Sequence, residues 1–176
     1  MSPTAPPESN SSHYPKVQVR AASEQDAYDV ARIYNQHVDA GGSTFDTVHW
    51  TTEKTQQLLA AERPEGWYVA VDTDAVIGWA NVRQFSHRHG YRFSYETGIY
   101  LDSSAIGRGV GDVLQVRVAE HCRDCGIHHA VAKIVADNQR SMAFHYRHGY
   151  ELVGIQKEIG HMQGKWVDVA ILQKIY

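Results

Sequence analysis

The stretch Ala105–Asp112 reads AIGRGVGD and stands between a strand-like segment and a long amphipathic segment. Glycines at Gly107, Gly109 and Gly111 allow the backbone to approach a ligand closely. The first turn of a helix leaves backbone N–H groups without partners and carries a partial positive charge, so the stretch predicts a site for an anion such as a diphosphate. Arg108 would add a positive charge at its rim. The alternative is a glycine-rich turn that binds nothing.

Two well-known glycine motifs do not fit this stretch. No Gly-Lys-Ser/Thr follows it, which excludes a P-loop. It also comes after several predicted strands rather than within a first βαβ unit, where a dinucleotide fingerprint belongs.

The rest of the chain alternates between the two periodicities of regular structure. A period of two, bounded by turn residues, indicates strands, and apolar residues at helical spacing indicate helices. Ser23 and Asp26 form a capping-box pattern at the first predicted helix. The expected strands are 16–22, 67–71, 75–85, 92–102, 130–136, 150–158 and 165–175, and the expected helices are 24–38, 52–62, 110–125 and 138–148. This order indicates an α+β fold with a hairpin-rich sheet and helices on its faces.

Composition limits the possible partners and location. The chain has 176 residues, which suits one domain over 16–176 after a flexible, Pro- and Ser-rich tail over 1–15. A formal net charge of -3 argues against binding to nucleic acid. No long apolar run or signal-peptide pattern occurs, so we expect neither membrane insertion nor export. The two cysteines, Cys122 and Cys125, suit a reducing compartment, and we expect the cytoplasm.

Three segments together carry a resemblance to a known family. The run of strand, short turn, R-G-x-G and helix resembles the acetyl-CoA motif of the GCN5-related N-acetyltransferase (GNAT) superfamily, usually Q/R-x-x-G-x-G/A. Ile106 departs from it at the first position, whereas both required glycines are present. The segments 94–111, 136–150 and 164–174 look like the branch of phosphinothricin and methionine-sulfone N-acetyltransferases, and the likeness extends over roughly 17–176.

The resemblance implies a fold, a reaction and partners. The GNAT fold is a mixed central sheet of about seven strands flanked by about four helices. Its members are acyltransferases that use acetyl-CoA as co-substrate and need no metal. The branch implies direct transfer, within a ternary complex, to the α-amine of a small amino acid or analogue, by an enzyme that is a homodimer.

Two candidate catalytic residues follow from the resemblance. Attack on a thioester requires a neutral amine, and Glu96 matches the general base, acting directly or through water. A solvated strand carboxylate is the alternative. Backbone N–H near Ile99 or Tyr100 would stabilise the oxyanion. His145 occupies the slot in which many members place a tyrosine that protonates the leaving thiolate, although it could instead be a packing histidine.

The remaining matched positions would hold the cofactor. Asn138 in this family bonds the pantetheine chain, and it can also cap a helix. It lies seven positions before His145, about two helical turns, so both lie on one helix face with Ser141 between them. The cofactor-binding candidates are Ile99, Tyr100, Leu101, Gly107, Arg108, Gly109, Val110, Gly111, Asp112, Asn138 and Ser141.

The acceptor site is less defined by sequence. An arginine suits bidentate binding of the amino-acid carboxylate, and both Arg88 and Arg92 match family positions. Tyr91 lies between them, and Phe45 matches a position that contributes an apolar wall. Ser86 replaces a lysine of the phosphinothricin enzymes, which weakens the case for that substrate.

Other functions stay open at this point. A different amine acceptor, such as a polyamine or a protein N-terminus, could use the same scaffold, although the arginines would repel a polycation. A non-catalytic acyl-CoA-binding module is a further alternative. Zinc is a weak one: Cys122 and Cys125 have nearby histidines, His121, His128 and His129, but the cysteines fall on the apolar stripe of their helix.

Overall fold

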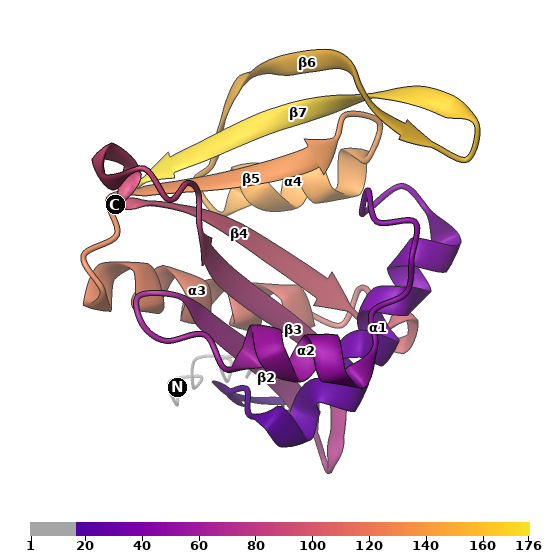
Figure 1. Cartoon of the computed structure of the whole chain (residues 1–176), viewed down its shortest axis with the longest axis vertical. Helices are drawn as coiled ribbons and strands as arrows, with labels where there is room; N and C mark the ends of the chain where they lie inside the picture. The colour runs from indigo at the N-terminus through magenta and orange to yellow at the C-terminus, as the bar shows by residue number, and fades with distance from the viewer. Residues whose placement is uncertain (1–16) are drawn as a thin grey trace, which may run out of the picture.

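The computed structural model describes residues 17–176, and these form one seven-stranded sheet with helices on its faces (Figure 1). The expectation for residues 1–15 lies outside the described part. The strands are β1 (Val17–Ala21), β2 (Gly66–Asp72), β3 (Ala75–Gln84), β4 (Ser94–Leu101), β5 (His129–Val135), β6 (Glu151–Met162) and β7 (Lys165–Ile175). The helices are α1 (Ala27–Ala40), α2 (Thr52–Leu59), α3 (Val110–Asp124) and α4 (Gln139–Arg147). The predicted α+β class and its order of elements are confirmed.

The sheet has the order β1-β2-β3-β4-β5-β7-β6 and opens at its centre. All neighbouring strands are antiparallel except β4 and β5, which are parallel and pair only from Ser94–Glu96 to His129–Val131. Beyond Glu96 the two strands diverge (Figure 1). Because a strand without a neighbour leaves backbone hydrogen-bonding groups free, this split can receive a ligand.

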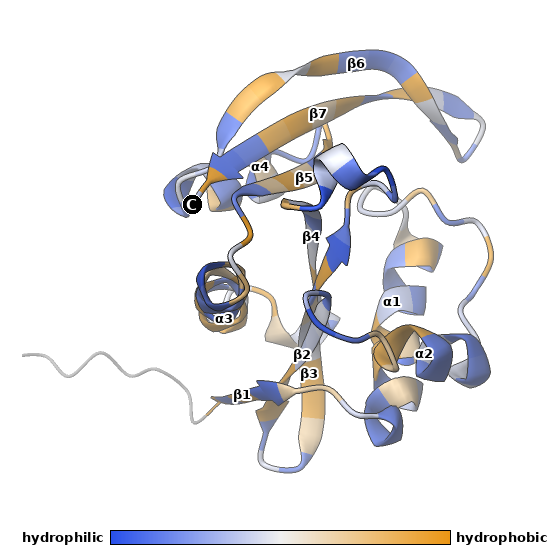
Figure 2. Cartoon of the chain, turned by 60° about the vertical axis from the view of Figure 1, so that its left-hand side comes forward, coloured by the Kyte–Doolittle hydropathy of each residue, from blue (hydrophilic) through white to orange (hydrophobic). Residues whose placement is uncertain are grey.

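Helices cover both faces beside the split. Figure 2 shows α1 and α2 on one face of β1–β3 and α3 on the other. On the first face Trp79 and Val69 pack in one cluster with Ile33 of α1. On the second face Val82 and Leu114 of α3 belong to another cluster. Both faces are therefore anchored by apolar burial, which fixes the register of the strands between them.

Local signals set most element boundaries. The capping box of Ser23 and Asp26 is confirmed, but residues Glu24–Asp26 form a 3-10 turn, so α1 begins at Ala27 rather than at 24. The second helix ends at Leu59, three residues before the expected end. Strand β6 continues to Met162, past the expected end at 158, because the hairpin with β7 resumes pairing after an irregularity between Gln156 and Gly160.

Within residues 17–176 no helix is long and apolar enough to cross a membrane.

Candidate active site

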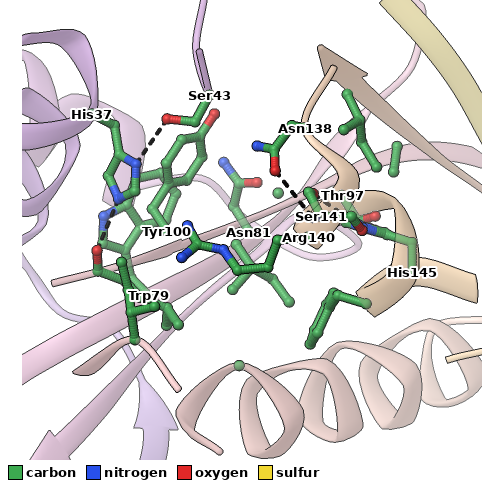
Figure 3. Close-up of a pocket in the computed structure, with 18 of the residues that line it drawn as sticks. His37, Ser43, Trp79, Asn81, Thr97, Tyr100, Asn138, Arg140, Ser141 and His145 are labelled. Carbon is green, nitrogen blue, oxygen red and sulfur yellow. Dashed lines mark hydrogen bonds between the residues drawn. The ribbon is translucent and has the colours of Figure 1, made fainter. Parts of the chain in front are cut away.

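A cavity of about 410 Å³ opens where β4 and β5 separate (Figure 3). Side chains from α1, β3, β4, β5 and α4 line it, together with the loop that precedes α3. Twelve of the predicted site residues contribute to its lining: Glu96, Ile99, Tyr100, Leu101, Gly107, Gly109, Val110, Gly111, Asp112, Asn138, Ser141 and His145. Segments far apart in the chain therefore meet in one cavity.

The glycine-rich stretch forms an open cradle at one end of this cavity. Gly107 and Gly109 have φ angles of 80° and 78°, a left-handed conformation that favours glycine. Gly109 is the N-cap of α3 and supplies no side-chain cap. Within the described chain the backbone N–H groups of Gly109, Val110 and Gly111 form no hydrogen bond. These free amides at a helix N-terminus fit the diphosphate of coenzyme A.

Two charged residues of the stretch are already engaged. Arg108 is outside the cavity lining, and its Nη2 lies 2.6 Å from Asp72 Oδ2 at the β2–β3 turn. Asp112 accepts hydrogen bonds from Arg147 and His148, each at 2.7 Å. Burial would raise the pKa of Asp112, but these two bonds lower it. Asp112 therefore ties the start of α3 to the end of α4.

Helix α4 presents three predicted residues to the cavity. Asn138 Oδ1 accepts a hydrogen bond from the backbone N–H of Ser141 at 3.1 Å and so caps the helix, as expected. His145 is buried, and its Nδ1 lies 2.8 Å from the carbonyl oxygen of Ser141. Because a carbonyl can only accept, Nδ1 carries the proton. Burial lowers the pKa of His145, so the ring is neutral near pH 7 and Nε2 has no proton to give.

Glu96 lies between two cations. Its Oε2 accepts a hydrogen bond from Lys133 Nζ at 2.7 Å. Its Oε1 lies 4.0 Å from Arg83 Nη2. Glu96 and Arg83 are register partners of β4 and β3, and Lys133 stands on β5 beyond the last paired residue. The carboxylate is thus fixed at the start of the split rather than free on a solvated strand.

Aromatic rings form the wall of the cavity on the α1 face. The rings of Trp79 and Tyr100 stack with centroids 4.6 Å apart, and those of Tyr34 and Trp50 with centroids 3.9 Å apart. Burial raises the pKa of Tyr100, so its hydroxyl keeps its proton. These rings make this wall of the cavity largely apolar.

The predicted acceptor residues lie outside the cavity lining. Arg88, Tyr91 and Arg92 lie in or next to the short 3-10 segment between β3 and β4. Arg92 packs over the ring of Phe93 at 4.4 Å. A Cβ atom on Gly160 would lie 2.1 Å from the Phe45 ring, so Phe45 joins the α1–α2 loop to the β6–β7 hairpin.

Sequence reasoning missed eight polar residues of the cavity lining: His37, Ser43, Asn81, Arg83, Thr97, Lys133, Arg140 and Arg147. Asn81 and Arg83 lie in a segment recognised only as a strand, and Lys133 is a single cation within an apolar strand. Two-residue alternation could have placed Asn81 and Arg83 on one face. Nothing in the sequence indicates that this face meets Glu96.

The cysteines show no metal-site geometry. Both are free, Cys122 is packed in the core, and burial raises the pKa of its thiol to about 11. His121 is bonded to Tyr68 and to the Pro64 carbonyl. Among residues 17–176 no group of three or more His, Cys, Asp or Glu side chains could hold a metal ion.

Comparison with known proteins gives a family match over most of the chain. The acetyltransferase (GNAT) domain family matches residues 19–171. The phosphinothricin N-acetyltransferase of Streptomyces coelicolor is 32% identical over 160 residues, which cover 88% of this chain and 94% of that protein. An L-methionine sulfoximine/L-methionine sulfone acetyltransferase of Pseudomonas paraeruginosa is 27% identical over 88% of this chain and 92% of its own length.

Solved structures show the same architecture. A GNAT superfamily phosphinothricin acetyltransferase from Sinorhizobium meliloti, in complex with AcCoA, has a TM-score of 0.86 and 30% identity, covering 90% of this chain and 88% of that one. A ribosomal-protein-alanine N-acetyltransferase from Brucella melitensis has a TM-score of 0.87 and 30% identity, covering 90% of this chain and 99% of its own.

Proposed function

The chain belongs to the GNAT acetyltransferase family, and from that premise we propose that it transfers an acetyl group from acetyl-CoA directly to the α-amine of a small amino acid or amino-acid analogue. The observation that supports this function is a single cavity whose two ends suit the two substrates. The free amides of Gly109, Val110 and Gly111 lie at one end, and the carboxylate of Glu96 lies at the split of the sheet. The first end suits a diphosphate and the second suits an amine.

In this proposal the residues of the cavity have separate tasks. Acetyl-CoA supplies the activated acetyl group. The chain's own amides bind the diphosphate, and β4 offers its unpaired edge from Thr97 onward to the pantetheine arm. Backbone N–H near Ile99 or Tyr100 stabilises negative charge on the acetyl oxygen. Asn138 caps α4 and holds the same arm.

Glu96 acts as the general base. Its Oε2 is held by Lys133, which orients the carboxylate, while Oε1 is left to accept the amine proton. Removal of that proton exposes the nitrogen lone pair, without which the amine cannot attack the thioester carbonyl. The hydrogen bond of Lys133 to Oε2, with no hydrogen bond to Oε1 within the described chain, supports this role.

His145 shapes the cavity in this proposal. Its Nδ1 proton is donated to the Ser141 carbonyl, and the uncharged ring has an unprotonated Nε2. As a proton donor to a thiolate it would first have to take up a proton that burial disfavours. Its packing against the ring of Tyr150, at 5.1 Å, instead fixes the end of α4.

Relatives support the acceptor class. The relatives from Streptomyces coelicolor and Pseudomonas paraeruginosa act, by their names, on phosphinothricin, methionine sulfoximine and methionine sulfone, all analogues of amino acids. The Brucella melitensis protein, by its name, acts on a ribosomal protein, which is why the assay below includes a peptide. The cationic pair beside Glu96 disfavours a polyamine, because like charges repel in a partly buried site.

A thiol-release assay tests the function. Purified protein and acetyl-CoA are mixed with methionine sulfone, methionine sulfoximine, phosphinothricin, the common amino acids, spermidine and an Ala-peptide. Release of coenzyme A with an amino acid or analogue, and formation of the N-acetyl product by mass spectrometry, supports the proposal. Turnover confined to spermidine or the peptide contradicts the acceptor class, and no turnover with any amine contradicts an enzymatic role.

We also propose a homodimer, as the sequence resemblance implies. Strand β6 is an edge of the sheet, and it exposes large apolar side chains, among them Val153 at 58% and Ile159 at 58%. Trp166 of β7 is 65% exposed. An exposed apolar sheet edge favours pairing with a second copy. Light scattering after size exclusion tests this, with a dimer expected for the wild type and a monomer for Val153→Lys.

A further inference from the structure

We propose that Arg83 binds the α-carboxylate of the acceptor, so that this site recognises free α-amino acids rather than their amides or the N-termini of peptides. The inference rests on the proposed function and deepens it by naming the chemical group that the acceptor must carry next to its amine.

The first observation is an incompletely used guanidinium beside the base. Arg83 lines the cavity, and its side chain is 44% exposed. Its one ion-pair distance within the described chain is the 4.0 Å to Glu96 Oε1, and it forms no hydrogen bond there. Lys133 by contrast already donates to Glu96 at 2.7 Å. Arg83 therefore keeps the fork of donors that matches a carboxylate.

The second observation is an unsatisfied amide in the same row of the sheet. Asn81 stands two residues before Arg83, is 4% exposed, and its amide points into the cavity (Figure 3). Its side-chain amide forms no hydrogen bond to any residue of 17–176, whereas its backbone pairs within the sheet. Its register partner is Gly98, where a Cβ atom would lie 2.9 Å from Asn81 Oδ1. An unpaired amide that lines the cavity offers a donor and an acceptor to a polar ligand on this face of β3.

The third observation is the spacing between the base and the cation. In an α-amino acid the amine and the carboxylate share one carbon atom. Glu96 Oε1 and Arg83 Nη2 lie 4.0 Å apart. When the amine nitrogen of an acceptor lies about 3 Å from Glu96 Oε1, the carboxylate on the same carbon atom therefore lies within a similar distance of Arg83. One acceptor can thus satisfy both groups at once.

Charge balance points the same way. Arg83 and Lys133 contribute two positive charges around the single negative charge of Glu96, a net charge of +1 in this row. An α-amino acid with a neutral amine carries one negative charge, on its carboxylate. A carboxamide or a peptide N-terminus carries none there and leaves the arginine without a charged partner in a partly buried site.

The test compares free acids with carboxamides. We would measure kcat/KM for methionine sulfone and phosphinothricin, each also as its carboxamide, with the wild type, Arg83→Gln and Arg83→Lys. Arg123→Gln is the matched control, because Arg123 lies on the far helix α3 over the ring of Tyr176. The coenzyme A affinity and the Tm of each variant are recorded alongside.

We expect Arg83→Gln to lower kcat/KM for the free acids about 10- to 100-fold, mainly through KM, because a hydrogen bond to a charged group is lost. The carboxamides should change by less than about twofold, so the wild-type preference for the acid disappears. Arg83→Lys keeps the charge but not the fork and should lie between. Arg123→Gln should match the wild type.

Equal losses for acid and carboxamide, or no loss for either, would overturn the role of Arg83. If Arg83→Gln does not fold, the acid-to-carboxamide ratio of Arg83→Lys decides: an unchanged ratio overturns the proposal and a reduced one supports it. If the wild type acetylates acid and carboxamide equally, this result contradicts the proposed role of Arg83 but does not contradict the proposed function. A wild type that acetylates no amine in the larger panel contradicts the proposed function instead.

Discussion

Lys133 Nζ donates a hydrogen bond to Glu96 Oε2 at 2.7 Å, and this contact joins β5 to β4 just beyond their last register pair, Glu96 with Val131. The side chain of Glu96 is 26% exposed and that of Lys133 is 45% exposed, so water screens the pair. The pair therefore contributes little to the stability of the fold, and its main effect is to orient the Glu96 carboxylate. It holds one carboxylate oxygen and leaves the other facing the cavity.

Replacing Glu96 with Gln should depress turnover and spare cofactor binding. Gln has nearly the same shape but cannot accept the amine proton, and loss of a general base typically costs about 10²- to 10⁴-fold in rate. The diphosphate cradle lies at the other end of the cavity, so the Kd for coenzyme A should stay within about twofold. Thiol release and calorimetry measure the two quantities. Glu120→Gln on the exposed face of α3 is the control, and unchanged turnover in Glu96→Gln would remove Glu96 as the base.

Replacing His145 with Asn should have a small effect on rate. Burial lowers the pKa of His145, so the wild-type ring takes up a proton only below the usual value near 6.5 and is neutral from pH 7 to 9. The Asn amide can still donate to the Ser141 carbonyl. We expect kcat within about tenfold of the wild type and parallel pH profiles of kcat/KM over that range. A loss above about 100-fold together with a missing limb of the profile would establish His145 as a proton-transfer group.

Gly109→Ala should weaken coenzyme A binding more than it weakens the fold. Its φ of 78° strains an alanine by about 1–2 kcal/mol. Relief of this strain would move the amides of Gly109, Val110 and Gly111, to which we assign the diphosphate. Gly164→Ala has a φ of 76° and equally open space around its Cβ, but it lies in the β6–β7 turn. Calorimetry should show a raised Kd for Gly109→Ala alone, while urea unfolding should show similar losses for both; equal Kd values would contradict the cradle.

Asp26→Asn should destabilise the fold and remove part of its sensitivity to acid. Asp26 is 5% exposed and accepts two hydrogen bonds from Arg20, at 2.7 Å each, and these lower its pKa although burial opposes them. A lowered folded-state pKa means that its stabilisation is complete above the unfolded value near 3.9 and is lost as pH falls below it. Because Arg20 is 43% exposed, we expect a loss of about 1–3 kcal/mol at pH 7.

Urea unfolding at pH 7 and pH 3 measures this effect. The difference between wild type and Asp26→Asn should shrink at the lower pH. A difference that is the same at both values would mean that the lost stability comes from packing and not from the ionised carboxylate.

Several parts of the molecule follow from local chemistry alone. Glycine adopts a left-handed backbone more readily than any other residue, and Gly107 and Gly109 both adopt it here. Asn138 caps α4, and the capping box at Ser23 starts the first helical segment. These features depend on neighbours within a few residues, so their signals survive in the linear sequence.

The observed ends of helices and strands differ more from the sequence-based prediction where the pairing partner is distant in the chain. Strand β6 continues past an irregularity because β7 pairs with it again beyond Gln156. The positive φ of Glu158, 51°, lies within that irregularity and has no glycine to signal it. Pairing across a hairpin outweighed local preference there.

The residues around Glu96 also show the difference between neighbours in the chain and neighbours in the fold. Arg88 and Arg92 are predicted acceptor residues because they match family positions, and in the structure they flank a 3-10 segment outside the cavity lining. Arg83 reaches Glu96 instead because β3 and β4 pair in the register Arg83↔Glu96.

The sequence by itself determined the helices, the strands, the glycine cradle and the family likeness, since each is encoded by residues close together in the chain. Only the tertiary structure decided which charges surround Glu96, because Lys133 is 37 positions away and Arg83 lies across a strand pair. Strand register sets those neighbours, and register is chosen by the burial of both faces of the sheet against α1 and α3. That burial is a property of the whole fold and of no single segment.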